Sequence, residues 1–201
     1  MRTQSVLLSA AFFAAAPAHA GELMGDRTAY NRAYASVGFP ITDNYAIDEG
    51  SLKLRWTIED AGQIANLRSA AAPTVQFRLV ESVNLNGSGT AELSCIDFAE
   101  EFATITLTAS IYGPDCGTAD DEHSSITVPA FVHTGDGYLV AEIADLIDEV
   151  EADLSGPMQE LTIDVQTQMA AEVSYGEDTH GPDTANAKCS NSSLTNRLSG
   201  V

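Results

Sequence analysis

Apolar and polar side chains alternate along several segments of the chain. Residues 51–58 and 103–111 carry an apolar residue at every second position, with polar residues between them. Residues 75–85 follow the same pattern, although Glu81 interrupts the apolar face and predicts a bulge or an inward charge at that point. A period of two is typical of half-buried strands, so these segments predict three strands.

Turn residues and proline help to place the neighbouring elements. An Asn-Gly pair within residues 84–89 predicts a turn. Residues 91–95 alternate after it, so we expect a hairpin with the preceding strand. Residues 126–132 predict a further strand, and Pro129 favours an edge position for it because proline cannot donate to a sheet. Residues 63–73 are polar and rich in alanine, which indicates a connection.

The period changes twice in the last third of the chain. Within residues 139–154 the apolar side chains recur at steps of three and four, which predicts an amphipathic helix that ends before Gly156 and Pro157. Residues 160–175 then alternate with a period of two throughout. Because a typical strand has about 5–6 residues, we expect this segment to be bent, broken in two or shared between two sheets.

Several strands separated by turns, with one amphipathic helix at about 139–154, predict a mainly β protein with the fold of an antiparallel β-sandwich. We expect this sandwich domain to cover residues 21–175. Its first part, residues 21–50, is irregular apart from a short helical pattern around residues 26–35. Residues 176–201 are polar and contain many Gly, Asn and Ser residues, which indicates a C-terminal loop or tail.

Residues 1–20 have the features of a signal peptide. Arg2 supplies a positive charge, a short apolar stretch follows, and Ala18 and Ala20 form a small-x-small cleavage site. The apolar stretch is shorter than the roughly 20 residues that a membrane span needs. We therefore expect an exported chain, located in the periplasm, outside the cell or on its surface, with no membrane insertion after cleavage.

The chain is strongly acidic. It has 29 Asp and Glu residues against 9 Lys and Arg residues, so its formal net charge is −20. Loss of Arg2 with the signal peptide would change this charge to −21. Because phosphate groups are bound by Lys and Arg, we expect no nucleic acid partner. We interpret the acidity mainly as a solvated surface that keeps the protein soluble.

Three cysteines, Cys95, Cys116 and Cys189, are present. An exported chain meets an oxidising compartment, so we expect at least one disulfide. A bond between Cys95 and Cys116 closes the shortest loop and is the pairing that we predict. Cys189 would then be unpaired or bonded to another chain. Their spacing matches no zinc motif.

Metal binding is a second hypothesis. Calcium takes oxygen ligands from acidic loops, and the segment 115–122 is such a loop, although it lacks the EF-hand pattern. His133 and His180 also lie near carboxylates, but their spacing matches no zinc or copper motif, so we interpret them as exposed loop residues. The candidate metal ligands are Asp115, Asp120, Asp121, Glu122 and His123.

No catalytic motif is visible: the chain has no G-x-S-x-G, and 29 acids cannot by themselves nominate a catalytic pair. We predict no catalytic residues and favour a non-enzymatic function. The first hypothesis is an exported structural or adhesive surface protein, and its most specific version is a self-assembling filament subunit. Its partner would be a second copy of the chain or another surface protein. Its self-association would use an unpaired edge of residues 160–175. The alternatives are a periplasmic or secreted protein that binds a divalent cation such as Ca²⁺, and a hydrolase whose site the sequence does not reveal.

Overall fold

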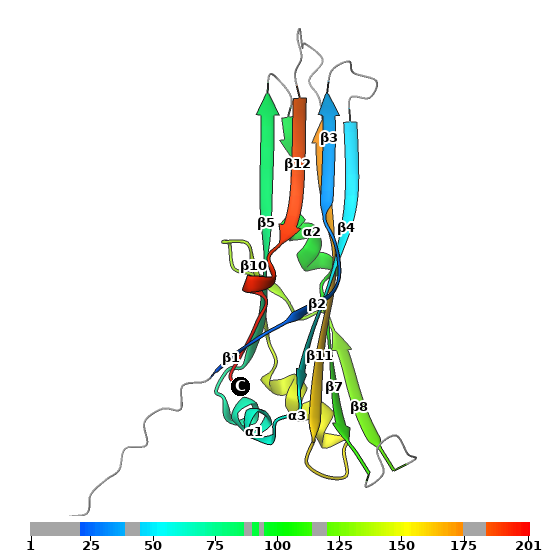
Figure 1. The fold of residues 1–201 in the computed structure, drawn as a ribbon, viewed down its shortest axis with the longest axis vertical. Helices are drawn as coiled ribbons and strands as arrows, with labels where there is room; N and C mark the ends of the chain where they lie inside the picture. Colours follow the sequence, from blue (N-terminus) through cyan, green and yellow to red (C-terminus); the bar gives the residue numbers. More distant parts are fainter. Residues whose placement is uncertain (1–20, 39–44, 87–89, 93–94, 114–119, 175–183) are drawn as a thin grey trace, which may run out of the picture.

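In the computed structural model, which describes residues 21–38, 45–86, 90–92, 95–113, 120–174 and 184–201, the chain forms two antiparallel β-sheets packed against each other. The predicted β-sandwich is therefore confirmed. The molecule is elongated, and its longest strands run parallel to the long axis (Figure 1). We call the end that carries α1 and α3 the helical end, and the opposite end the distal end.

The first sheet is built around β11 (Glu160–Ser174), a single strand of 15 residues. β11 pairs with β4 (Tyr45–Ile58) along its whole length. Its other side pairs with β7 near the helical end and with β6 near the distal end. The remaining strands of this sheet are β2 (Asp26–Asn31), β6 (Thr90–Glu92), β7 (Thr104–Ile111) and β8 (Glu122–Val128).

The second sheet is built around β5 (Thr74–Asn86). Close to the helical end, β5 lies between β13 and β10; further along, it pairs with β12, which in turn pairs with β3. The strands that complete this sheet are β1 (Glu22–Met24), β3 (Ala33–Gly38), β9 (Val132–His133), β10 (Tyr138–Glu142), β12 (Thr184–Asn191) and β13 (Arg197–Ser199).

The core changes in character along the molecule. Near the helical end the buried side chains are large, and further along they are small because β11 contacts β3 and β12 across a narrow sandwich. Large buried residues include Leu54, Trp56, Ile58, Phe77 and Ile105. Small ones include Ala33, Ala35, Ala171, Ala185 and Ala187.

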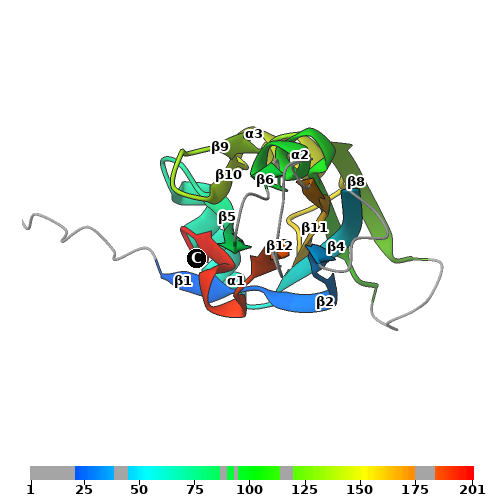
Figure 2. The same ribbon diagram turned by 90° about the horizontal axis from the view of Figure 1, so that it is seen from above.

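Three α-helices are present in the described residues: α1 (Ala61–Ser69), α2 (Cys95–Phe102) and α3 (Ala144–Ala152). The carboxylate of Asp60 caps α1 by accepting from the Gln63 amide at 2.9 Å. α3 packs against β7 and β8, and α2 packs against β11. Seen from above, α2 and α3 lie on one side of the sandwich, whereas β1 and β2 lie on the other (Figure 2).

Gly50 marks the point where the chain crosses from one sheet to the other. β2 pairs with β4 in the first sheet, and β3, which follows almost at once, pairs with β12 in the second. A Cβ atom at Gly50 would collide with the carbonyl oxygen of Asn31 and the amide nitrogen of Ala33. Glycine at this position therefore lets the crossing backbone lie directly on β4.

The strands predicted at residues 51–58, 75–85, 103–111 and 160–175 are confirmed as β4, β5, β7 and β11 over the residues that these elements cover. The strand predicted at residues 126–132 is only partly confirmed: residues 126–128 end the edge strand β8, whereas Pro129 lies outside any strand and Val132 begins β9 in the other sheet. The predicted break or sharing of residues 160–175 is wrong, because β11 is one strand within one sheet.

Other predictions are also corrected. The first residues of the predicted helix 139–154 belong to β10, because they pair with β5, and α3 begins only at Ala144. The predicted hairpin is wrong, since β6 pairs with β11 and not with β5. Residues 184–201 are not a tail, because β12 and β13 are integral to the second sheet. Within residues 21–50 the described part forms strands and no helix.

Candidate functional site: an open strand edge beside helix α2

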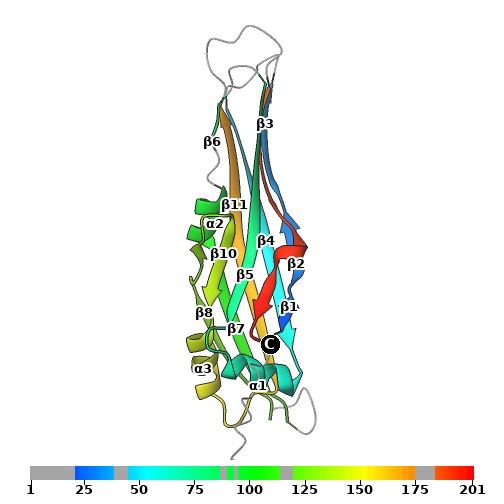
Figure 3. The same cartoon turned by 90° about the vertical axis from the view of Figure 1, so that its left-hand side faces the viewer.

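The distal half of β5 has one unpaired side in the part of the chain that the structure describes. β10 covers one side of β5 from Thr74 to Arg78 and then turns away at Gly137. β12 covers the opposite side from Leu79 to Asn86. No described strand pairs with residues 80–86 on the side that β10 has left. Figure 3 shows the molecule from this side: β5 runs up to the distal end, and β6 and β11 lie to its left.

The backbone groups that face this open side can be assigned from the hydrogen bonds. The Leu79 amide donates to the Gly137 carbonyl at 2.9 Å, so the backbone N–H and C=O of Leu79 point toward the β10 side. Backbone groups alternate in direction along an antiparallel strand. The amides and carbonyls of Glu81, Val83 and Leu85 therefore point toward the open side.

Contacts on the opposite side agree with this assignment. The Arg78 carbonyl accepts a hydrogen bond from the Asn191 side chain at 2.9 Å, and the Val80 carbonyl accepts one from the Ser190 hydroxyl at 3.3 Å. Both donors belong to β12. Even-numbered residues of distal β5 therefore hydrogen-bond within the sheet, and odd-numbered residues remain available at the edge.

The open edge is also apolar. Val83 and Leu85 are each 46% exposed, although they lie on the face of β5 that carries the buried Phe77 and Leu79. Val80, on the other face, is 43% exposed. Half-exposed valine and leucine beside unpaired backbone groups form a surface that another strand can cover, with both hydrogen bonds and apolar burial.

α2 lies at the base of this edge and is held there by several contacts. The Glu81 carboxylate accepts a hydrogen bond from the Ile96 amide at 3.2 Å, so this charge on the apolar face of β5 binds the first turn of α2. Glu81 itself is exposed, and the pairing of β5 with β12 continues through it without a bulge, so neither the predicted inward charge nor the predicted bulge is present.

The disulfide joins α2 to β12. Cys95 is bonded to Cys189, with Cα atoms 5.9 Å apart, and both residues are fully buried. The predicted Cys95–Cys116 pairing is therefore wrong, because one cysteine cannot form two disulfides. It failed because residues 95–102 form a helix instead of continuing a strand, and Cys95 in the first turn of this helix meets Cys189 of β12. Cys116 lies outside the described residues.

The predicted calcium ligands are only partly visible, since Asp115 also lies outside the described residues. The Asp121 carboxylate accepts from the Gly113 amide at 2.9 Å, and His123 Nδ1 is 2.9 Å from the Ser110 hydroxyl. Asp120 is exposed. The calcium site at residues 115–122 stays a prediction.

Glu122, the remaining member of that set, is bound to Ser155. Its carboxylate accepts from the Ser155 hydroxyl at 2.7 Å and from the Ser155 amide at 2.8 Å. The hydroxyl bond, followed by the amide bond, lowers the pKa of the Glu122 carboxyl below its ordinary value. This carboxylate therefore ties β8 to the loop after α3.

A different group of metal-ligating side chains comes together next to the open edge. The ligand atoms of Asp97, Glu100 and His133 all lie within 4.8 Å of one another. The sequence analysis interpreted His133 as an exposed loop residue, which is wrong, because it is half-buried at the end of β9. The two carboxylates lie on α2, which the sequence pattern did not predict. An i, i+3 pair of acids on a predicted helix is the signal that would have found them.

A hollow of about 480 Å³ lies at the helical end beside α1. The Arg68 guanidinium on its rim is paired with the Glu151 carboxylate at 2.9 Å. None of the residues that line this hollow, which include Ala61, Ile64, Arg68 and Met158, has a buried side-chain nitrogen or oxygen without a hydrogen-bond partner. This hollow therefore offers no group that calls for a ligand.

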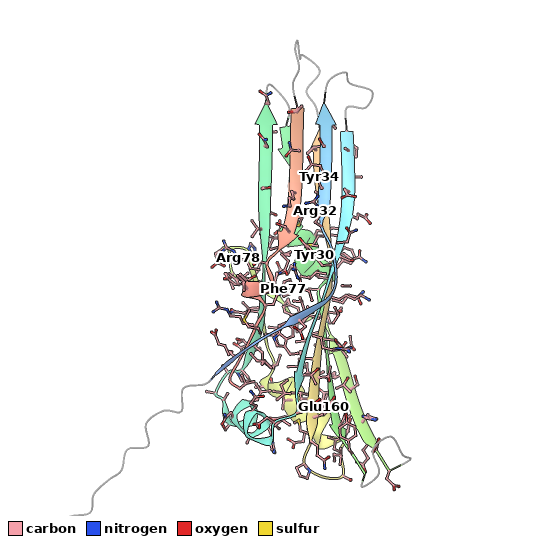
Figure 4. The ribbon with its side chains drawn as sticks, viewed as in Figure 1. Tyr30, Arg32, Tyr34, Phe77, Arg78 and Glu160 are labelled. Carbon is pink, nitrogen blue, oxygen red and sulfur yellow. A yellow bond between two sulfur atoms is a disulfide. The ribbon has the colours of Figure 1, made fainter. Side chains whose placement is uncertain are left out.

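An arginine–tyrosine ridge follows β2 into β3 on the side opposite α2. Figure 4 shows Tyr30, Arg32 and Tyr34 one after another along it. The Arg32 guanidinium lies 5.9 Å from the centre of the Tyr34 ring, and that of Arg27 lies 4.8 Å from the Tyr30 ring. These cation–π contacts order the arginine and tyrosine side chains on this surface.

No protein-family model matches the chain, and no curated protein matches it. Within the described residues, no helix combines the length and the apolar character needed to cross a membrane. Functional inference therefore depends on the geometry of the chain itself.

Proposed function

We propose that the chain is an exported, non-enzymatic structural protein of the cell surface that assembles with other copies of itself by adding a strand to the open edge of β5. The observation that carries this proposal is the unpaired side of residues 80–86, with its half-exposed Val83 and Leu85. A strand from a second copy would satisfy the free backbone groups and cover these side chains.

The edge lacks the features with which proteins usually prevent such pairing. Edge strands are commonly protected by lysine, proline, bulges or short length. Residues 80–86 contain no lysine or proline, their register with β12 is regular, and their one charge, Glu81, is bound to α2. β2, by contrast, has a register irregularity between Arg27 and Ala29. This difference favours distal β5 as the edge that accepts a partner.

The route of association differs from the one that the sequence suggested. Residues 160–175 cannot offer a long free edge, because β11 has β4 on one side and β7 and β6 on the other. Between β7 and β6, the Thr167 hydroxyl of β11 donates to the Ala99 carbonyl of α2 at 2.7 Å. The edge available for strand addition therefore belongs to β5.

Export is supported by two features. Residues 1–20 have the pattern of a cleavable signal peptide. The Cys95–Cys189 disulfide is of the kind that persists in oxidising compartments outside the cytoplasm. An elongated body with long continuous strands also suits a structural role better than a role that needs an enclosed small-molecule site.

The test compares two proline substitutions in neighbouring residues of β5. The Val83 amide points to the open side, so V83P should remove an intermolecular donor and leave the internal ladder intact. The Ser82 amide points to β12, so S82P should break an internal hydrogen bond and destabilise the monomer by about 1–3 kcal/mol. Light scattering reports assembly, and urea unfolding reports stability.

We expect the wild-type protein to associate more strongly as salt rises, because screening weakens repulsion between acidic chains. V83P should remain monomeric with nearly unchanged unfolding. If the wild-type protein is monomeric from low to high salt, or if V83P assembles as readily as the wild type, strand addition at β5 is wrong.

A further inference from the structure

Two carboxylates and one imidazole converge beside the base of the β5 edge. Asp97 and Glu100 are separated by three positions on α2, so they project from the same face of the helix. His133 ends the short strand β9, which α2 contacts. The ligand atoms of the three residues lie within 4.8 Å of one another, although their positions in the sequence span two separate elements.

One ring nitrogen of His133, Nε2, is buried without a hydrogen-bond partner within the part of the chain that the structure describes. A buried polar atom without a hydrogen-bond partner destabilises the fold, because it has lost its bonds to water. A ring nitrogen of neutral imidazole is also among the commonest metal ligands in proteins. A cation bound between His133 and the two carboxylates would give this nitrogen the partner that it lacks.

α2 is held firmly enough to keep its carboxylates in place. Cys95 anchors its first turn to β12, and the Ile96 amide is bound to Glu81 of β5. Further along, the Ala99 carbonyl accepts the buried Thr167 hydroxyl at 2.7 Å. These three contacts, from three different strands, fix the helix on both sides of Asp97.

His133 is fixed by its own strand. It pairs with Leu139 of β10, which in turn pairs with Phe77 of β5. The helix that carries Asp97 and Glu100 is thus bonded to β12 and β5, and the strand that carries His133 is paired with β10, so all three ligands are held by the second sheet. The site needs little rearrangement of the backbone in order to close around an ion.

We propose that Asp97, Glu100 and His133 form a binding site for a first-row divalent metal ion, with Zn²⁺ as the ion that the donor set favours. Zinc binds imidazole nitrogen and carboxylate oxygen at about 2.0–2.2 Å, usually with four ligands. Tetrahedral ligands at that distance are about 3.4 Å apart. Since the three ligand atoms lie within 4.8 Å of one another, each pair needs to approach by at most about 1.4 Å, and water can complete the shell.

The same donor set disfavours calcium. Ca²⁺ prefers six to eight oxygen ligands, whereas this site offers an imidazole nitrogen and two carboxylates. The proposed zinc site thus differs from the acidic segment 115–122 both in its ion and in its residues. It is also independent of strand addition at β5, because none of its three ligands lies on that strand.

The test measures binding of Zn²⁺ to the full, disulfide-bonded mature protein by titration calorimetry and by the rise in melting temperature. H133N and E100Q should each weaken Zn²⁺ binding at least tenfold. E101Q is the matched control, because Glu101 is exposed, adjacent on α2 and outside the cluster. E101Q should bind like the wild type, and Ca²⁺ at the same concentration should give a much smaller rise in melting temperature.

Circular dichroism checks that each variant is folded, and V83P should retain zinc binding whether or not the wild-type protein assembles. An H133N protein that still binds Zn²⁺ with wild-type affinity would overturn the site. Equal weakening by E100Q and E101Q would do the same, since it would show diffuse attraction to acidic surface. A wild-type protein that does not bind Zn²⁺ also refutes the inference.

Discussion

The disulfide between Cys95 and Cys189 connects residues that are 94 positions apart in the sequence. In the chain-entropy model, a cross-link that closes a loop of this length restricts the unfolded chain by about 4–5 kcal/mol. Both residues are fully buried, so replacing them with alanine also removes some packing. We therefore expect C95A/C189A to lower the free energy of unfolding by at least about 4 kcal/mol.

Urea unfolding of the oxidised wild type and of the double variant measures this difference directly. For a domain of this size, 4–5 kcal/mol corresponds to a fall of about 10–20 °C in melting temperature. Reduced wild-type protein should unfold close to the double variant. C116A is the control, because Cys116 takes no part in this bond and its replacement should leave the Cys95–Cys189 linkage in a non-reducing peptide map.

Two outcomes would refute the reasoning. A loss of less than about 1 kcal/mol in C95A/C189A would mean that the cross-link does not restrict the unfolded chain as the model requires. A peptide map that links Cys95 to Cys116 would place the bond itself elsewhere.

Two further predictions concern backbone crossing and pH. G50A should destabilise the protein by about 1–3 kcal/mol, because its methyl group would collide with the backbone of β2 and β3. G156A is the control, since its Cβ would meet only the Ile111 side chain at 3.7 Å, and it should change stability by less than about 1 kcal/mol. Thermal unfolding of both variants checks this. Because the pKa of Glu122 is lowered, its contribution to stability is present above its unfolded pKa, which is the ordinary glutamate value of 4.5, and is lost as the pH falls through the lower folded value. S155A should move the Glu122 titration, followed by carboxyl NMR, back toward 4.5, and the stability difference between S155A and wild type should shrink as the pH falls below that value.

The strands that the sequence predicted correctly are those with large apolar residues on the buried face. In β4, Leu52, Leu54 and Trp56 alternate with Lys53 and Arg55, and their burial follows that period. β7 and β11 show the same relation. A large side chain gains enough from burial that its position in the sequence reveals the face of the strand.

β3 and β12 have the same alternation but were missed. Their buried positions hold Ala33, Ala35, Ala185, Ala187 and Cys189, which face β11 across the narrow distal sandwich. Small residues carry little hydrophobic signal, and β12 has polar Asn, Lys and Ser between them. The pattern therefore resembles that of a polar tail, and only pairing with β5 and β3 identifies it as a strand.

The short helices were missed for a different reason. α1 has almost no amphipathic pattern, and its Asp60 cap is a single local signal. α2 follows a short strand closely, and its position depends on the disulfide to β12 and on Glu81 of β5. Both contacts join separate elements, so a local pattern cannot predict where α2 packs, although its buried Cys95 and Ala99 do recur at the four-residue step of a helix.

His133 was not predicted as a metal ligand for the same reason, because the residues around it come from distant parts of the sequence. His133 and the carboxylates of α2 are more than 30 positions apart at their closest, and the sequence contains no spacing motif that connects them. What brings them together is the pairing of β9 with β10, of β10 with β5, and the attachment of α2 to β5 and β12. Cutting the Cys95–Cys189 bond removes one of these links without altering any proposed ligand. Zinc affinity in C95A/C189A, measured under conditions where the variant is folded, should therefore fall relative to wild type, while H133N in the same background should abolish what remains.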